Sequence, residues 1–287
     1  MSQTPPDAVR IDLPRPSASY LEAVGAEWPA ALARAITSSR AWTAMLGAKL
    51  LVVEGEDPHL VAVGRFDAAG RARLAALQTL VETQLPALVY LNYAEVERAV
   101  QELGDRLRAE LGAEALASAS FVGVPRGGLI VLGMLAYALG LGAKQLSPAE
   151  GRPLVVVDDI VISGNRMLRW LAEHEPGAPV VLASLFSAPP LRRAALEDPR
   201  VAAVVSARDL TDRTPAVGSA EHAAWTGRWR SREPNVKSWF VGQTEHVCFP
   251  WNEPDIAMWN PVLERVERAW RLMPPELCLK HRAGGGS

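Results

Sequence analysis

The sequence predicts an α/β protein whose core is a doubly wound, mostly parallel sheet, preceded by an N-terminal α+β appendage. Apolar runs of strand length, rich in β-branched residues, alternate with segments of helical spacing through the middle of the chain. Such runs are typical of parallel strands that are buried on both faces. Two of the strand–helix junctions carry glycines or paired acids, as the ligand-binding edges of open sheets do. The expected strands lie at residues 120–124, 154–157, 180–186 and 201–206.

Length and composition limit the classes of function. The 287 residues, 49% hydrophobic and 22% charged, suit a globular protein with one large domain or a core domain with an appendage. A net charge of −2 predicts no general nucleic-acid binding surface, although a local basic patch stays open. No apolar run reaches the roughly 18 residues of a membrane span, and the first residues lack a signal-peptide layout, so we expect a soluble protein. Cys248 and Cys278 lack metal-ligand spacing, which favours a reducing cytoplasm.

The N-terminal part shows no motif that carries chemistry. We expect a Pro-rich, extended or disordered start, then a helical region interrupted at Pro29. A turn-rich connector predicts a hairpin, and helical spacing then returns. The Pro-rich start covers residues 1–18 and the first helical region residues 20–51. The hairpin is expected at residues 50–63 and the second helical region at residues 67–84.

A long amphipathic helix is expected to begin near Asn92, a plausible N-cap with Glu95 in the capping-box position. After the strand at 120–124, Arg126, Gly127 and Gly128 precede a buried helix at about 130–141. Two glycines at a helix start let backbone amides approach an anion closely, and arginine adds a permanent positive charge. Taken alone, a tight turn explains these residues as well.

The most informative residues are Asp158 and Asp159, which directly follow the apolar run from Leu154 to Val157. A small-residue loop and a helix from about Met167 come next. Backbone amides at a helix start suit a phosphate, whereas paired carboxylates suit sugar hydroxyls or a phosphate-bound Mg²⁺. A phosphorylated ribose has both needs. Two acids in a solvated turn are the alternative.

Later elements continue the alternation. We expect helices at about 191–198 and 260–275. The arginines of residues 208–232 are expected on a solvated surface.

The segment from Leu154 to Arg166 resembles the 5-phosphoribosyl-1-pyrophosphate (PRPP) loop of type I phosphoribosyltransferases. In that family four apolar residues precede two acids, three residues and Thr-Gly-x-Thr. Here Ser163 replaces the first Thr, Gly164 matches, and Arg166 replaces the last Thr. Residues 123–129, Gly-Val-Pro-Arg-Gly-Gly-Leu, resemble the pyrophosphate loop of the same family.

Residues 249–251, Phe-Pro-Trp, resemble the segment that covers the base in xanthine, guanine and hypoxanthine phosphoribosyltransferases. The resemblance implies a phosphoribosyltransferase-like domain at 89–258, after an appendage at 1–88 and before a C-terminal helix at 259–282 and a flexible tail at 283–287. Family members are commonly dimers, so a homodimer is implied.

The resemblance also implies site roles. Asp158 and Asp159 would be catalytic, hold the ribose hydroxyls, and meet the Mg²⁺ cofactor indirectly or through the ligand. The remaining PRPP-binding residues would be Arg126, Gly127, Gly128, Ser163, Gly164, Asn165 and Arg166. The base-binding residues would be Val247, Phe249 and Trp251.

Three departures separate this sequence from purine-type members. Ile162 stands where they have Asp, and Ala188 stands where they have Lys. Only a short connector, with Lys144 as its one basic residue, replaces the usual mobile lid. Two functions therefore stay open: transfer of the phosphoribosyl group of PRPP to a nucleobase-like acceptor, or a catalytically inactive PRPP- or nucleotide-binding sensor or partner protein.

Overall fold

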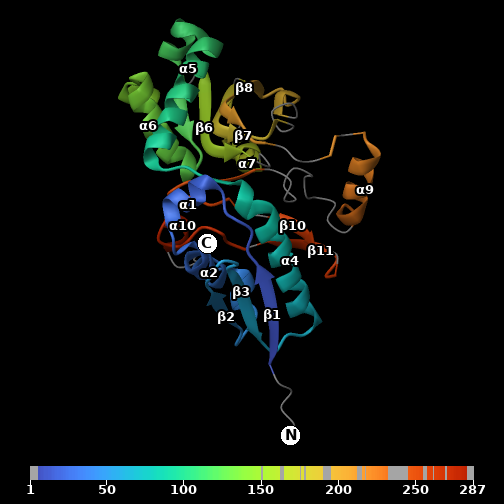
Figure 1. Cartoon of the computed structure of the whole chain (residues 1–287). Coiled ribbons are helices and arrows are strands. Elements are labelled where there is room, and N and C mark those ends of the chain that lie inside the picture. Colours follow the sequence, from blue (N-terminus) through green and yellow to red (C-terminus); the bar gives the residue numbers. More distant parts are fainter. Residues whose placement is uncertain are drawn as a thin grey trace. The chain divides into compact units, whose positions relative to one another are not determined.

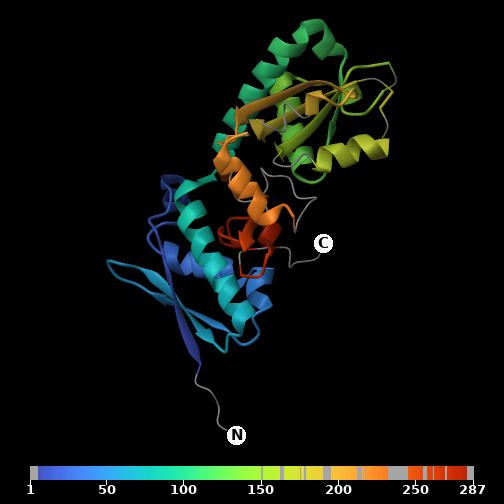
Figure 2. The same ribbon diagram turned by 90° about the vertical axis from the view of Figure 1, so that its right-hand side faces the viewer.

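The computed structural model divides the chain into two compact units, residues 93–212 and residues 1–92 together with 213–287. Figures 1 and 2 show the elements of both. The structure describes residues 6–149, 151–161, 165–174, 176–177, 179–189, 195–211, 215–216, 218–231, 245–254, 257–260, 262–268 and 270–282.

The unit of residues 93–212 contains a four-stranded sheet with the order β5-β6-β7-β8, and all neighbouring strands are parallel. The predicted α/β class with a parallel sheet is therefore confirmed. Helices α5 and α6 pack on each other; α5 also contacts β7 and β8, and α6 contacts β5 and β6. The elements are α5 (Tyr93–Ser118), β5 (Ser120–Gly123), α6 (Gly127–Leu139), η2 (Ala143–Gln145), β6 (Leu154–Val161), α7 (Asn165–His174), β7 (Val180–Ser187) and β8 (Val201–Asp209).

The central strands are apolar because both faces of the sheet are covered. Every residue of β7 is buried, as are all residues of β6 after Leu154, which is the environment that a continuous apolar run predicts. Helix α6 differs from the expected buried helix, because Tyr137 is 93% exposed and Leu129 is 53% exposed. Only one side of α6 lies on the sheet. Half of the helix expected at 191–198, residues 191–194, falls outside the described residues.

The other unit contains an antiparallel sheet with the order β1-β3-β2, which includes the predicted hairpin. A parallel pair β4-β9 and an antiparallel hairpin β10-β11 belong to the same unit. Its elements are β1 (Asp7–Asp12), α1 (Ala18–Val24), α2 (Trp28–Thr37), α3 (Arg40–Thr43), β2 (Lys49–Val53), β3 (His59–Gly64), α4 (Ala68–Gln84), η1 (Leu85–Ala87), β4 (Leu88–Tyr90), α9 (Ala220–Trp229), β9 (His246–Cys248), β10 (Ala257–Asn260), β11 (Arg265–Arg268) and α10 (Leu279–Arg282).

Residues 1–18 were expected to be extended or disordered, and in the structure Asp7–Asp12 form the extended strand β1. Residues 9–13, Val-Arg-Ile-Asp-Leu, alternate apolar and polar side chains, the period of a half-buried strand. Ile11 is fully buried, whereas Arg10 pairs at the surface with Asp12 and Asp57.

The C-terminal helix expected within 259–282 was also wrong, because β10 and β11 form a hairpin there and α10 has four residues. The Asn260 side chain accepts hydrogen bonds from the amides of Val262 and Leu263 and donates one to the Ala72 carbonyl. This side-chain turn competes with a helix, and Pro274 and Pro275 bar its continuation.

The two units also divide the chain differently from the expected boundaries at 88 and 258. The compact unit with the parallel sheet ends at residue 212, and residues 213–287 belong with the N-terminal segment. The pairing of β9 with β4 is one cause, since Val247 lies opposite Val89 in that ladder. Buried Trp270, Leu272 and Met273 join the same core as Tyr20. No helix among the described residues is long and apolar enough to cross a bilayer.

Candidate functional site

The acidic pair lies within β6, because the strand continues two residues beyond Asp159, to Val161. Asp158 and Asp159 are 1% and 0% exposed. Each carboxylate turns back on the strand: Oδ1 of Asp158 accepts from the Asp159 amide (2.9 Å), and Oδ1 of Asp159 accepts from the Ile160 amide (2.8 Å). Buried carboxylates without partners are costly, so these bonds fix both side chains in place.

The glycines of the second motif pack directly against the acids. Gly127 and Gly128 are the first residues of α6. A β-carbon on Gly127 would overlap Oδ2 of Asp159, and one on Gly128 would overlap the Val157 carbonyl oxygen. The peptide bond between Pro125 and Arg126 is cis, and Arg126 is exposed. The two motifs that sequence spacing predicted therefore meet, with the N-terminus of a thirteen-residue helix beside a buried carboxylate.

Arg166 occupies a different place from the expected one. It was expected to help hold a 5-phosphate, but its Nη2 donates to Oδ1 of Asp158 and to Oδ1 of Asp159, at 2.9 Å each. Its side chain is 44% exposed while both carboxylates are buried. The predicted phosphate-loop residues Ser163 and Gly164 lie outside the described residues, as does the side chain of Asn165, whose backbone begins α7.

Burial, and then the charge of Asp159, raise the pKa of Asp158 to about 8, although Arg166 opposes the shift. For Arg166, burial lowers the pKa, but the charges of Asp158 and Asp159 outweigh this and the pKa is raised. Burial and the neighbouring acid thus disfavour a second negative charge at this pair, and the permanent cation of Arg166 partly offsets that effect.

Polar residues at the ends of β7 and β8 were missed by the sequence reasoning. Ser187 Oγ donates to Ser206 Oγ (3.0 Å), and Ser206 Oγ lies 3.5 Å from Oδ1 of Asp209. Both serines are buried. A sequence signal existed, because polar residues interrupt apolar runs at the carboxyl ends of neighbouring parallel strands, where open sheets bind ligands.

The three predicted base-binding residues belong to the other unit. Val247, Phe249 and Trp251 are 0%, 0% and 1% exposed. The rings of Phe249 and Trp251 stack on each other, with centroids 5.2 Å apart and an interplanar angle of 9°. A base needs an open aromatic face, so in this structure these residues form part of a core and not a base platform.

Glu253 stands at the centre of a second buried polar group. Its carboxylate accepts from the amides of Leu272 and Met273 and hydrogen-bonds to His246 and His281. The ligand atoms of His246, Cys248 and Glu253 lie within 4.8 Å of one another. Because protein N–H donors already fill the carboxylate, this group is a network that fixes the C-terminal segment.

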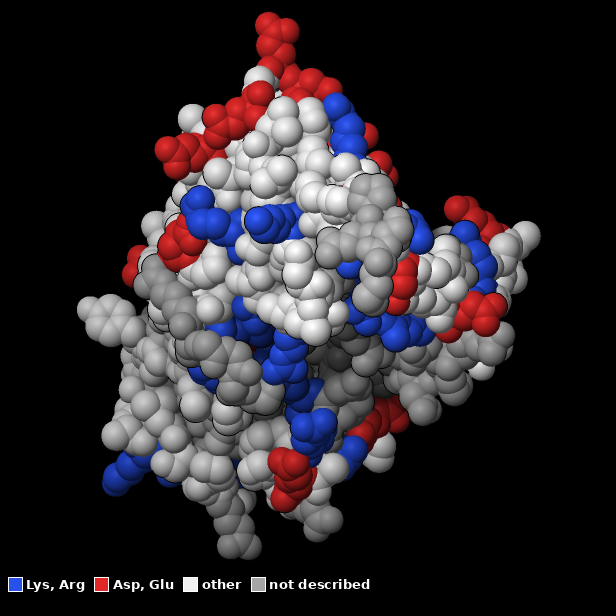
Figure 3. Space-filling model, turned by 90° about the horizontal axis from the view of Figure 1, so that it is seen from below, with Lys and Arg blue, Asp and Glu red and all other residues white. Residues whose placement is uncertain are grey.

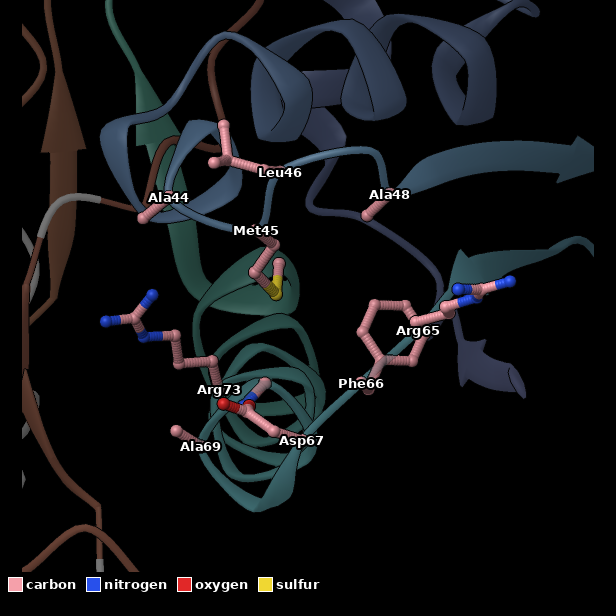
Figure 4. A pocket seen from close by; sticks show the side chains of 10 residues that line it. Ala44, Met45, Leu46, Ala48, Arg65, Phe66, Asp67, Ala69 and Arg73 are labelled. Carbon is pink, nitrogen blue, oxygen red and sulfur yellow. The ribbon is translucent and has the colours of Figure 1, made fainter. Parts of the chain in front are cut away.

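Two surface hollows formed by described residues are not lined by the acidic pair. One, of about 350 Å³, is bordered by Met45, Phe66, Arg65 and Arg73. The two arginines extend in opposite directions (Figure 4), so they do not converge on an anion. The other lies between α5 and α6 beside exposed Tyr137. On the face drawn in Figure 3, basic side chains lie among acidic and uncharged ones.

Comparison with known proteins finds similarity among solved structures only. No family model and no curated protein matches the chain. A hypothetical protein from Neisseria gonorrhoeae, solved with bound ppGpp, is 17% identical, with a TM-score of 0.31, over 48% of this chain and 94% of its own. Orotate phosphoribosyltransferase from Aeropyrum pernix is 26% identical, with a TM-score of 0.30, over 40% of this chain and 72% of its own. The similarity to both is a distant structural one.

Proposed function

We propose that the unit of residues 93–212 binds a phosphorylated ribose and that the protein transfers the 5-phosphoribosyl group of PRPP to a nucleobase or related nitrogen heterocycle, with release of pyrophosphate. The observation that carries this proposal is the packing of Gly127 against the buried Asp159 carboxylate. Acids for sugar hydroxyls and the backbone amides of a helix start for phosphate then stand side by side.

The two acids take different roles in this proposal. Oδ1 of Asp159 accepts from the Ile160 amide and Arg166, and Oδ2 faces Gly127, so Asp159 mainly positions Arg166 and the start of α6. Asp158 is the acid that we assign to the ribose hydroxyls. Ser163, Gly164 and Asn165 would bind the 5-phosphate through the start of α7.

Arg126, Gly127 and Gly128 would bind the pyrophosphate. A Mg²⁺ ion would neutralise the pyrophosphate charge as part of the ligand. It does not fit as a direct ligand of the acidic pair, because Arg166 and backbone amides already occupy both Oδ1 atoms. Departure of pyrophosphate leaves positive charge on the ribose, and catalysis rests on electrostatic stabilisation and positioning of the acceptor.

A PRPP- or nucleotide-binding sensor without catalysis is the second candidate. One observation favours it: in the described residues the Arg166 cation lies against both acids, whereas an oxocarbenium-like transition state gains from nearby negative charge. Burial of Trp251 agrees with it, since a ring that is 1% exposed offers no open face to a base.

Pyrophosphate release with PRPP, Mg²⁺ and a panel of nucleobases separates the two candidates. Release with any base, lost in Asp158→Asn/Asp159→Asn and kept in the surface control Asp105→Asn, supports transfer. Binding of PRPP without release supports the sensor. Thermal unfolding of each variant checks that the fold persists, and Asp158→Asn alone provides a milder second variant. Absence of both binding and release contradicts both candidates.

A further inference from the structure

Arg166 forms an unusual bridge between two buried carboxylates. One nitrogen, Nη2, lies 2.9 Å from Oδ1 of Asp158 and 2.9 Å from Oδ1 of Asp159. Each of these oxygens also accepts a backbone amide, from Asp159 and Ile160 respectively. The position between the two carboxylates is therefore filled by a cation that belongs to the protein.

The rest of the pair leaves little space for a hydrated metal ion. Oδ2 of Asp159 is packed so closely against Gly127 that a β-carbon there would overlap it. Mg²⁺ demands near-octahedral oxygen coordination and gives up its water reluctantly. A guanidinium is weakly hydrated, permanently charged and able to bond to two oxygens at once. Between buried acids it therefore competes well with a small divalent ion.

We propose that Arg166 takes the place of a divalent cation at the acidic pair, so that the site meets its phosphorylated sugar without a metal ion on either carboxylate. The sugar part of this proposal rests on the proposed function; the exclusion of metal does not. Thr, which the family pattern places at this position, carries no charge. Replacing Arg166 should thus open a cation site between Asp158 and Asp159.

A titration of the metal-stripped protein with Mn²⁺, followed by the electron paramagnetic resonance of the free ion, tests the exclusion directly. The parent protein should show no site that depends on Asp158. Arg166→Thr should gain at least about tenfold in Mn²⁺ affinity, because two carboxylates then lack their counter-charge. The double variant Arg166→Thr/Asp158→Asn should lose that gain.

Two further variants serve as controls. Arg166→Lys keeps the charge and should exclude Mn²⁺ as the parent does. Arg169→Thr removes an exposed arginine from the same helix and should behave as the parent. A parent site lost in Asp158→Asn would overturn the proposal. So would a folded Arg166→Thr protein, checked by circular dichroism, that binds no more Mn²⁺ than the Arg169→Thr control.

Ribose 5-phosphate tests the sugar part, since it lacks the pyrophosphate that chelates metal in PRPP. The parent should bind ribose 5-phosphate equally in Mg²⁺ and in EDTA. Arg166→Thr should bind it at least about tenfold more weakly in EDTA than in Mg²⁺. A parent affinity that falls in EDTA overturns the metal-free site. If the parent shows no binding in either buffer, the proposed function fails, while the Mn²⁺ titration still decides the role of Arg166.

Discussion

Gly127 and Asp159 approach so closely that no side chain fits between them: a β-carbon on Gly127 would overlap the carboxylate oxygen Oδ2. Gly127 follows β5 at the start of α6, whereas Asp159 lies within β6. Only glycine fits at position 127 beside the Asp159 carboxylate, and the turn that this glycine permits packs against that carboxylate. Adding a single methyl group is enough to test a contact this close.

Gly127→Ala should destabilise the unit of residues 93–212 by about 1–3 kcal/mol, because the new methyl group must displace Asp159 or the start of α6. Chemical denaturation measures this change. Gly133→Ala is the matched control on the same helix, since a β-carbon there meets nothing within 4 Å. It should stabilise the protein by about 0.5–1 kcal/mol through better helix propensity. Equal effects of the two substitutions would contradict the packing described for Gly127.

Asn260→Ala should destabilise the protein by about 2 kcal/mol, because the buried amide satisfies Val262, Leu263 and the Ala72 carbonyl. Urea unfolding provides the measurement. Asn252→Ala, a partly exposed position elsewhere in the same unit, is the comparison and should cost less. A negligible effect at Asn260 would mean that this side chain does not hold the β10-β11 hairpin.

Glu253 should make the protein sensitive to acid. Burial raises its pKa, but hydrogen bonds to His246 and His281 outweigh burial and lower it to about 2. A depressed pKa contributes stability above the unfolded value near 4.5 that is lost as the pH falls towards 2. Unfolding free energies measured from pH 6 to pH 2 should fall in that window by a few kcal/mol, because a tenfold change in proton affinity corresponds to about 1.4 kcal/mol.

Glu253→Gln should remove this pH-dependent component. The control is Glu276→Gln, which breaks a surface ion pair with Arg34 and should change stability by less than about 1 kcal/mol at every pH. A parent whose stability is flat between pH 5 and pH 2 would contradict the assigned charge state of Glu253.

Asp158 should give the opposite pH dependence. Its pKa is raised by burial to about 8, so the folded protein holds a proton that the unfolded chain loses near pH 4. Stability from this group is present at low pH and lost as the pH rises from about 4 to 8. Asp158→Asn cannot titrate, and it leaves the bond between Arg166 and Asp159 in place.

The difference in unfolding free energy between Asp158→Asn and the parent should therefore shift in favour of the variant as the pH rises from 5 to 8.5. A difference that is constant over this range would show that Asp158 is charged throughout.

The parallel sheet was predictable because its strands are apolar along their whole length, and only strands buried on both faces need that composition. Asp158, Gly127 and Gly128 were predictable as neighbours for a related reason. Parallel strands bring their carboxyl ends to one edge of the sheet, so motifs that follow successive strands come together.

Other features were not predictable from local patterns. Arg166 was expected to bind a phosphate, but its side chain turns back to Asp158 and Asp159. Nothing in the neighbouring residues of the sequence indicates this contact. Trp251 was expected at an open site, but the pairing of β9 with β4 carries it into a core. Long-range packing decides both positions. The hairpin that begins at Ala257 depends on the buried side-chain amide of Asn260. Its residues have helical spacing in the sequence, so the hairpin was not expected.

In the function that we propose, the buried acids of β6 and the glycines of α6 bind a phosphorylated ribose. The most direct measurement is a calorimetric titration of the full-length protein with PRPP and Mg²⁺, repeated with Asp158→Asn/Asp159→Asn and Asp105→Asn. We expect one saturable site in the parent and in Asp105→Asn, and at least about a hundredfold loss of affinity in the double variant, since both acids of the pair are replaced by amides. Equal binding by all three proteins, or no binding by the parent, would contradict the account.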